Sequence, residues 1–300
     1  MKRLIGLTLM LGLWLCGAQA QLLYKISGNG LKKASYIVGT HHLTDESFAS
    51  RIPGIQQAML ETSQVCGEVP MTDMFNADTL KMMTEAMMLP AGTTIESLFT
   101  PTQMKELSAF ISKYTGADYA TVKPMVERLS PAALSTQFTA AMYLKSHPGS
   151  FDPTKGIDNY FQKEAAKKGD AVIGLETCSF QIQILFKSQS VKRQAELLMC
   201  LVSHEKESLK NLEDMTTAYL NQDLSALKKV TDEKLGDGCD YTPEEEAALI
   251  DGRNAAWIKK MPSIMEKQPT LFAVGAAHLP GDKGVLKGLE KAGYKVEPMK

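Results

Sequence analysis

The chain carries the stretch YIVGTHHL at residues 36–43, and the same pattern returns near the end as FAVGAAHL at residues 272–279. Each copy has an apolar run, a glycine, two intervening residues, a histidine and a leucine. A short apolar run that stops at a glycine predicts a buried strand ending in a tight turn. The repeat therefore predicts two related half-sites. His42 and His278 would lie on loops at the carboxyl ends of their strands, where α/β sheets bind ligands.

Two more apolar runs end at a glycine that is followed by a carboxylate. The first is QVCGE at residues 64–68 and the second is AVIGLE at residues 171–176, so Glu68 and Glu176 follow predicted strands. Helical segments separate these strands along the chain, and this alternation favours a layered α/β fold over a helical bundle.

The stretch between the second and third predicted strands is long and helical in character. It runs from about residue 74 to 168, is rich in Met and Ala, and contains the helix-start signals Thr100-Pro101 and Ser130-Pro131. We expect a large helical insertion there. Further helices are expected over residues 181–234, 243–267 and 286–292.

The first twenty residues have the features of a cleavable secretory signal peptide. A basic MKR start precedes an apolar run over residues 4–16, and Ala18-Gln19-Ala20 forms a small-residue cleavage site. Cleavage after Ala20 predicts an exported protein, periplasmic or secreted, with residues 21–300 forming a single domain. A lipid anchor on Cys16 is disfavoured because Leu15 precedes it. No later apolar stretch is long enough to span a bilayer, so we expect no stable membrane insertion.

Four cysteines remain after the expected cleavage, which is an even number in an oxidising compartment. Cys200 and Cys239 flank a helical, Lys- and Glu-rich stretch, and we expect a disulfide between them. Ordinary buried thiols are the alternative. The absence of any C-x-x-C spacing disfavours zinc ligation by paired cysteines.

Charge and known motifs exclude several functional classes. Thirty-three Lys and Arg residues balance thirty-four Asp and Glu residues without forming a basic patch, so nucleic acid is not an expected partner. His204-Glu205 starts like a metalloprotease H-E-x-x-H helix, but Ser208 stands where the second histidine is required. No G-x-S-x-G element is present, which disfavours a serine nucleophile.

The predicted strand ends bring together residue types that can carry hydrolytic chemistry. Two imidazoles and two carboxylates are a ligand set suited to Zn, Mn or Fe, and equally an acid/base set that needs no metal. His41 has no counterpart in the second copy, where Ala277 stands. The chemistry is therefore expected to depend on His42 and not on His41.

Four short elements together resemble the TraB/GumN family, which is related to the TIKI proteases and the pheromone-shutdown proteins. They are GTHH at residues 39–42, GLET at 174–177, Arg253-Asn254, and GAAHLPG at 275–281. The resemblance covers essentially the whole mature chain. It implies an α/β fold with a mixed sheet core of the erythromycin-esterase/ChaN-like type, carrying the helical insertion.

The resemblance also implies a function and a set of site residues. His42, His278 and Glu176 are the expected ligands of a divalent metal (Mn, Co, Zn or Fe), and Glu68, Glu176 and Arg253 are the expected catalytic residues. Arg253 could clamp a substrate carboxylate or an oxyanion through its planar fork. The implied protein is a metal-dependent peptidase, or hydrolase of small amides and esters, with a peptide or small molecule as partner. The alternative is a non-catalytic regulator that binds peptide, metal or haem.

Overall fold

The four strands expected from the apolar runs all form in the structure, a computed structural model described here for residues 21–149 and 152–300. They are β2 (Ser35–Thr40), β3 (Gln64–Gly67), β4 (Ala171–Gly174) and β5 (Thr270–Gly275). Each strand ends at or one residue after its glycine. The expected signal peptide, residues 1–20, lies outside the described residues.

These strands belong to a six-stranded mixed sheet with the order β4-β3-β5-β2-β1-β6. β4, β3, β5 and β2 are mutually parallel. β1 (Leu23–Ser27) pairs antiparallel with both β2 and β6 (Lys295–Pro298). The predicted α/β fold with a mixed sheet is thus confirmed. The four strand ends expected to carry site residues all lie at one edge, because the strands that carry them run in the same direction.

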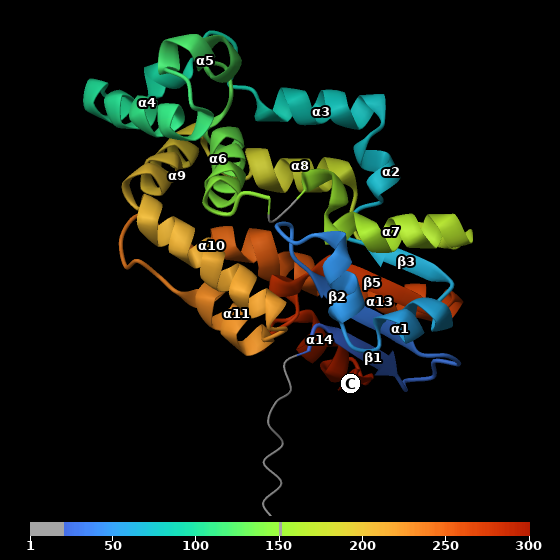
Figure 1. The fold of residues 1–300 in the computed structure, drawn as a ribbon. Coiled ribbons are helices and arrows are strands. Elements are labelled where there is room, and N and C mark those ends of the chain that lie inside the picture. The colour runs from blue at the N-terminus through green and yellow to red at the C-terminus, as the bar shows by residue number, and fades with distance from the viewer. Residues whose placement is uncertain (1–20, 150–151) are drawn as a thin grey trace, which may run out of the picture.

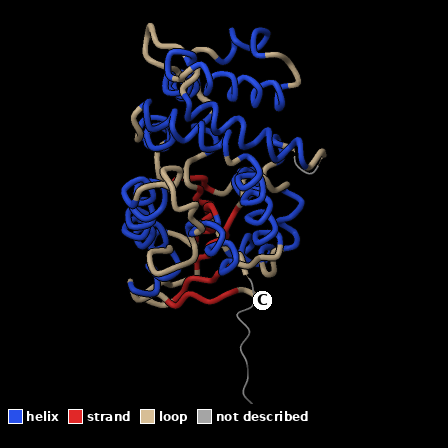
Figure 2. The backbone as a smooth tube through the Cα atoms, turned by 90° about the vertical axis from the view of Figure 1, so that its left-hand side faces the viewer, coloured by secondary structure: helices blue, strands red, loops and turns tan. Residues whose placement is uncertain are grey.

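Helices cover both faces of the sheet (Figure 2). The β2–β3 and β3–β4 connections move one way across the sheet, and the β4–β5 connection moves back. Right-handed crossovers therefore place α1 (Ile55–Glu61) and α7 (Ile157–Lys168) on one face. The same rule places α13 (Gly252–Lys267) and α14 (Val285–Lys291) on the other face.

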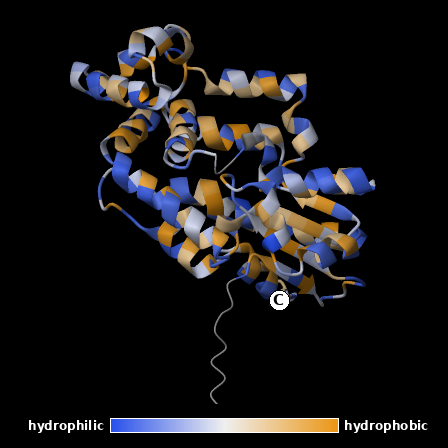
Figure 3. Ribbon diagram, in the orientation of Figure 1, coloured by the Kyte–Doolittle hydropathy of each residue, from blue (hydrophilic) through white to orange (hydrophobic). Residues whose placement is uncertain are grey.

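The main core lies between the sheet and these helices. α7 buries Ile157, Phe161 and Ala165 at helical spacing, and α13 buries Trp257, Met261 and Met265 in the same way. The outer side of α7 is largely hydrophilic, whereas the strands are predominantly hydrophobic (Figure 3). Removal of this apolar surface from water is the main favourable contribution to the fold.

A second group of helices lies beyond the carboxyl edge of the parallel strands (Figure 1). Thr100 and Ser130 cap two of them by accepting the backbone N–H groups of Gln103 and Ala133, so both predicted helix starts are confirmed. The helices of this group have two apolar cores that are separate from the main core. The group comprises α2 (Met71–Met74), α3 (Ala77–Met87), α4 (Pro101–Thr115), α5 (Tyr119–Val126), α6 (Pro131–Ser146), α8 (Cys178–Lys187) and α9 (Val191–Ser203).

The helical layer therefore extends beyond the 74–168 stretch, because α8 and α9 join it. The treatment of residues 21–300 as one domain stays a prediction. In the described ranges 21–149 and 152–300, no helix combines the length and the apolar character that crossing a bilayer requires.

A disulfide joins the segment between the helical layer and α13 to the end of α9. It contains α10 (Glu205–Leu220), α11 (Leu224–Asp232), α12 (Pro243–Glu246) and the π-helical turn η4 (Ala247–Asp251). Cys200 at the end of α9 forms a disulfide with Cys239, which confirms the expected pairing. Cys66 and Cys178 are buried free thiols.

Candidate functional site

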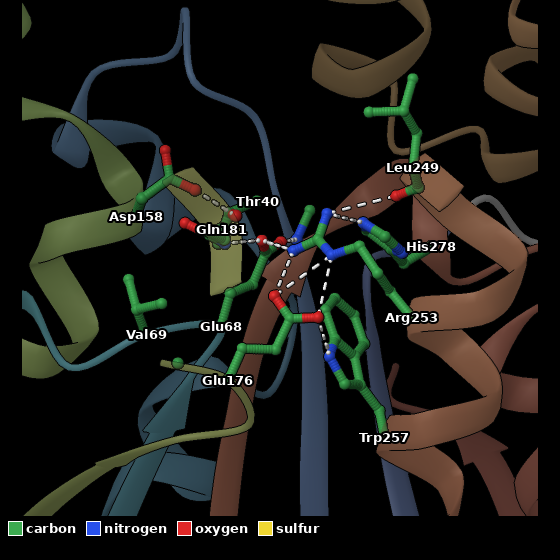
Figure 4. A network of polar contacts seen from close by, with 12 residues as sticks. Thr40, Glu68, Val69, Asp158, Glu176, Gln181, Leu249, Arg253, Trp257 and His278 are labelled. Carbon is green, nitrogen blue, oxygen red and sulfur yellow. Dashed lines mark hydrogen bonds and ion pairs between the residues drawn. The ribbon is translucent and has the colours of Figure 1, made fainter. Parts of the chain in front are cut away.

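The carboxyl edge of the sheet brings together four of the five residues expected in the site (Figure 4). Glu68 directly follows β3, and Glu176 comes two residues after β4. His278 ends the short helical turn η5 (Ala276–His278) after β5, and Arg253 lies in the first turn of α13. Close packing supports this edge, since a Cβ on Gly39 would lie 2.9 Å from the Cβ of Ala276.

Arg253 is the centre of the cluster. Its Nε lies 2.9 and 3.2 Å from the two carboxylate oxygens of Glu176. Its Nη2 donates to Glu176 Oε2 at 2.9 Å and to Glu68 Oε2 at 2.6 Å. Its Nη1 lies 3.3 Å from the carbonyl oxygen of Leu249 and 3.3 Å from His278 Nε2. A guanidinium has five N–H groups, so these contacts engage every donor of Arg253.

Both carboxylate oxygens of Glu176 also accept hydrogen bonds. Trp257, one helical turn after Arg253, donates its indole N–H to Glu176 Oε1 at 2.8 Å. The Arg253 guanidinium lies over the same indole, 4.9 Å from the ring centroid. The Glu176 side chain is 4% exposed. Both carboxylate oxygens are therefore held by buried donors in a bidentate, charge-assisted pair.

The contacts of His278 define its tautomer. Nδ1 lies 2.7 Å from the amide oxygen of Asn254, an acceptor, and Nε2 faces the Arg253 guanidinium, which can only donate. The ring proton is therefore on Nδ1, and Nε2 accepts. Burial lowers the pKa of His278 to about 4, with Arg253 acting in the same direction. The imidazole is neutral at physiological pH.

Glu68 is the least enclosed carboxylate of the cluster, with a side chain 16% exposed. Its Oε1 accepts the N–H of Gly275 at 2.8 Å, and its Oε2 accepts from Gln181 at 2.8 Å as well as from Arg253. Burial acts to raise the pKa of Glu68, but Arg253 and the Gly275 N–H lower it. Glu68 is thus ionised, and one lone pair of Oε1 is left open.

His42, the fifth expected residue, lies apart from the Arg253 contacts and at the surface. Its Nδ1 lies 2.9 Å from the Asp158 carboxylate in the first turn of α7, and its side chain is 81% exposed. Thr40 donates to the other carboxylate oxygen of Asp158. Asp158 and Arg253 lie on opposite sides of Glu68 (Figure 4). The Asp158 carboxylate raises the pKa of His42 to about 9, and Glu68 adds to this effect.

His41 faces a different direction from His42. Its Nε2 lies 3.0 Å from the Thr216 hydroxyl, and its ring packs against Tyr219 at a centroid distance of 5.3 Å. Burial lowers the pKa of His41 to about 4. His41 thus joins β2 to α10, and the hypothesis that the chemistry does not depend on it stays a prediction.

The arrangement does not fit a divalent metal held by His42, Glu176 and His278. Glu176 and His278 direct their lone pairs at a guanidinium, and a second cation between them would displace it. Within residues 21–149 and 152–300, the one group of three candidate ligands with converging atoms is His204, Asp237 and Cys239, which lies elsewhere.

Three residues of this site were not expected from the sequence. Asp158 and Gln181 come from helices α7 and α8, and no strand-end pattern marks either of them. Trp257 has a local signal, because residues four apart on a helix lie on the same face. Because Trp257 follows Arg253 by four residues, the sequence could have placed it on the same helix face as Arg253, next to the site.

Fold and site together define a class: mixed α/β proteins with a polar site at the carboxyl edge of their parallel strands, beneath a helical layer. The chain belongs to the TraB/PrgY/gumN family, whose sequence model matches residues 22–298. No curated protein and no solved structure matches the chain.

Proposed function

We propose that this protein hydrolyses amides or esters, with His42 as the general base and Asp158 as the residue that orients it. The contact between His42 and Asp158 carries this proposal. It occupies Nδ1 and leaves Nε2 free to face solvent at the sheet edge. A histidine held by a carboxylate is the usual arrangement of a positioned proton acceptor.

The proposed reaction needs two proton transfers. His42 Nε2 takes a proton from water while the water oxygen bonds to the substrate carbonyl carbon, and the Asp158 carboxylate stabilises the imidazolium. The imidazolium then returns the proton to the leaving nitrogen or oxygen as its bond to that carbon breaks. The nearby negative charge of Glu68 favours the protonated intermediate form of His42.

The buried cluster has a positioning role in this proposal. Arg253 has no donor left for a substrate carboxylate or oxyanion, so it acts by holding Glu68, Glu176 and His278 in place. Glu176 is too enclosed to reach a substrate. Glu68 alone retains an open lone pair toward the site, where it can contact the attacking water or a substrate N–H.

The exposure of His42 supports a peptide substrate, and the disulfide supports an oxidising compartment. His42 is at the surface, so a chain too large for an enclosed cavity can reach it. The disulfide between Cys200 and Cys239 is typical of exported proteins. We therefore propose an exported peptidase or esterase.

We expect turnover to survive metal removal, because the proposed base is a histidine held by a carboxylate. Purified protein is incubated with a peptide library and with small ester substrates, before and after treatment with a chelator. Product formation that persists after chelation supports the proposal. Loss of activity that one divalent ion restores would favour a metal mechanism, and stoichiometric capture of a peptide without product would favour a binding protein.

The activity should increase with pH, because the neutral form of His42 accepts the proton. The pKa of His42 is raised to about 9, so kcat/KM should rise as the pH approaches that value. Asp158→Asn removes the charge that raises this pKa, and the midpoint should move down toward the ordinary value of 6.5. The measurement is the pH profile of kcat/KM for both proteins.

The matched control for this profile is Asp214→Asn, which removes an exposed carboxylate paired with Lys210. It should leave the midpoint unchanged. A rate that decreases with increasing pH, or a midpoint that is the same with and without Asp158, would contradict the assignment of His42 as base.

A further inference from the structure

Two side chains that can bind a metal lie beside the disulfide. His204 follows Cys200 by one helical turn at the end of α9, and Asp237 precedes Cys239 by two residues. His204 Nε2 lies 3.4 Å from Asp237 Oδ2. The ligand atoms of His204, Asp237 and Cys239 all lie within 4.8 Å of one another, and Cys200 Sγ is bonded to Cys239 Sγ.

We propose that Cys200, His204, Asp237 and Cys239 bind a zinc ion when the disulfide is reduced. Two thiolates, an imidazole and a carboxylate are donors that Zn²⁺ accepts in four-coordinate sites. The ligands come as two local pairs, one on a helix and one in a loop, so a C-x-x-C spacing is not needed. The site is separate from the proposed hydrolytic site and independent of that proposal.

Reduction and metal binding balance as two successive steps. A dithiol reductant supplies two electrons to the Cys200–Cys239 bond and leaves as its own disulfide, and each cysteine sulfur gains a proton. Zn²⁺ then binds the two sulfurs as thiolates and releases those two protons. The disulfide and the ion are mutually exclusive, because both use the same sulfur atoms.

Contacts that do not involve sulfur hold the ligand loop in place. Arg193 donates to the carbonyl oxygens of Gly238 and Asp240, each at 2.7 Å. The Asp240 carboxylate accepts the backbone N–H groups of Leu235 and Gly236, each at 2.8 Å. Because these bonds survive reduction, the loop that carries the ligands should stay near α9 after the disulfide opens.

The loop is also arranged to present a ligand. Cys239 donates its N–H to Asp237 Oδ1 at 2.8 Å, which leaves Oδ2 facing His204. The side chains of His204 and Asp237 are 33% and 44% exposed, so an ion can reach them. Cys239 lies on the wall of a hollow of about 660 Å³ that opens between α10 and this loop.

Cobalt(II) is the probe for this site, because its visible absorption reports coordination number and its near-ultraviolet absorption reports thiolate ligation. We expect the reduced full-length protein to bind one equivalent of Co²⁺ with the spectrum of a four-coordinate thiolate site, and Zn²⁺ should displace it. The oxidised protein should show neither band. A reduced protein that binds no Co²⁺, or an oxidised protein with the same spectrum, would overturn the proposal.

Variants separate this site from the other thiols. His204→Ala and Asp237→Asn keep both cysteines, and each should weaken Co²⁺ binding at least about tenfold, since even outer contacts of metal ligands are worth that much. Cys178→Ser removes a thiol outside the site and should change nothing. Circular dichroism confirms that each variant is folded. Equal binding by wild type and both ligand variants would show that His204 and Asp237 are not ligands.

Discussion

Replacing His42 with alanine should lower kcat/KM by ~10²–10⁴-fold, the usual contribution of a positioned general base. Above the raised pKa of His42, where the ion pair with Asp158 is absent, the thermal midpoint should hardly change, because the side chain is mostly exposed and surface substitutions of this kind have small effects on stability. Both quantities are measured on the purified variant, with initial rates on the substrate found for the wild type.

His41→Ala is the matched control, one residue away in the chain. It removes contacts to Thr216 and Tyr219, so it should reduce stability more than His42→Ala and activity far less. Wild-type turnover in His42→Ala would disprove the proposed base.

Replacing Arg253 with methionine should lower the free energy of unfolding by ~3–5 kcal/mol, the cost of leaving one side of a buried ion pair without its partner. The change removes all five donors at once and leaves the carboxylates of Glu68 and Glu176 uncompensated. Urea denaturation of the wild type and the variant measures the difference.

A compensated variant tests the reason for this loss. When Glu176→Leu and Glu68→Gln are added to Arg253→Met, no uncompensated carboxylate remains, and most of the stability should return. Lys283→Met removes an exposed cation paired with Asp251 and should cost less than about 1 kcal/mol. A loss of that small size for Arg253→Met would show that the cluster does not stabilise the fold.

The parallel part of the sheet could be predicted from the sequence, and its antiparallel part could not. Parallel strands covered on both faces are nearly continuous apolar runs, and the four such runs in the chain are β2, β3, β4 and β5. The run in β4 predicts a buried strand as well, but β4 lies at the edge of the sheet and is only partly buried. β1 and β6 have polar residues among the apolar ones. Their sequences, LYKIS and KVEP, do not form an uninterrupted apolar run, so a search for buried runs does not find them.

The site could be predicted where its residues follow a strand directly. Glu68, Glu176 and His278 lie together because parallel strands end at a common edge. Asp158 is 116 residues from His42 in sequence, and it reaches the histidine only because the first turn of α7 lies against the end of β2. Such a pairing depends on how the helix packs, which no local pattern specifies. The roles assigned to these residues stay predictions.

The position of β5 in the sheet affects the order in which the protein can form during synthesis. β5 lies between β2 and β3, although both are completed by residue 67 and β5 begins only at residue 270. While the ribosome makes the intervening chain, β2 and β3 have no strand between them and cannot join. Contacts so distant in sequence form slowly and leave strand edges exposed in the meantime. For the exported protein that we propose, this delay is useful, because the chain can reach a transport channel before its core closes.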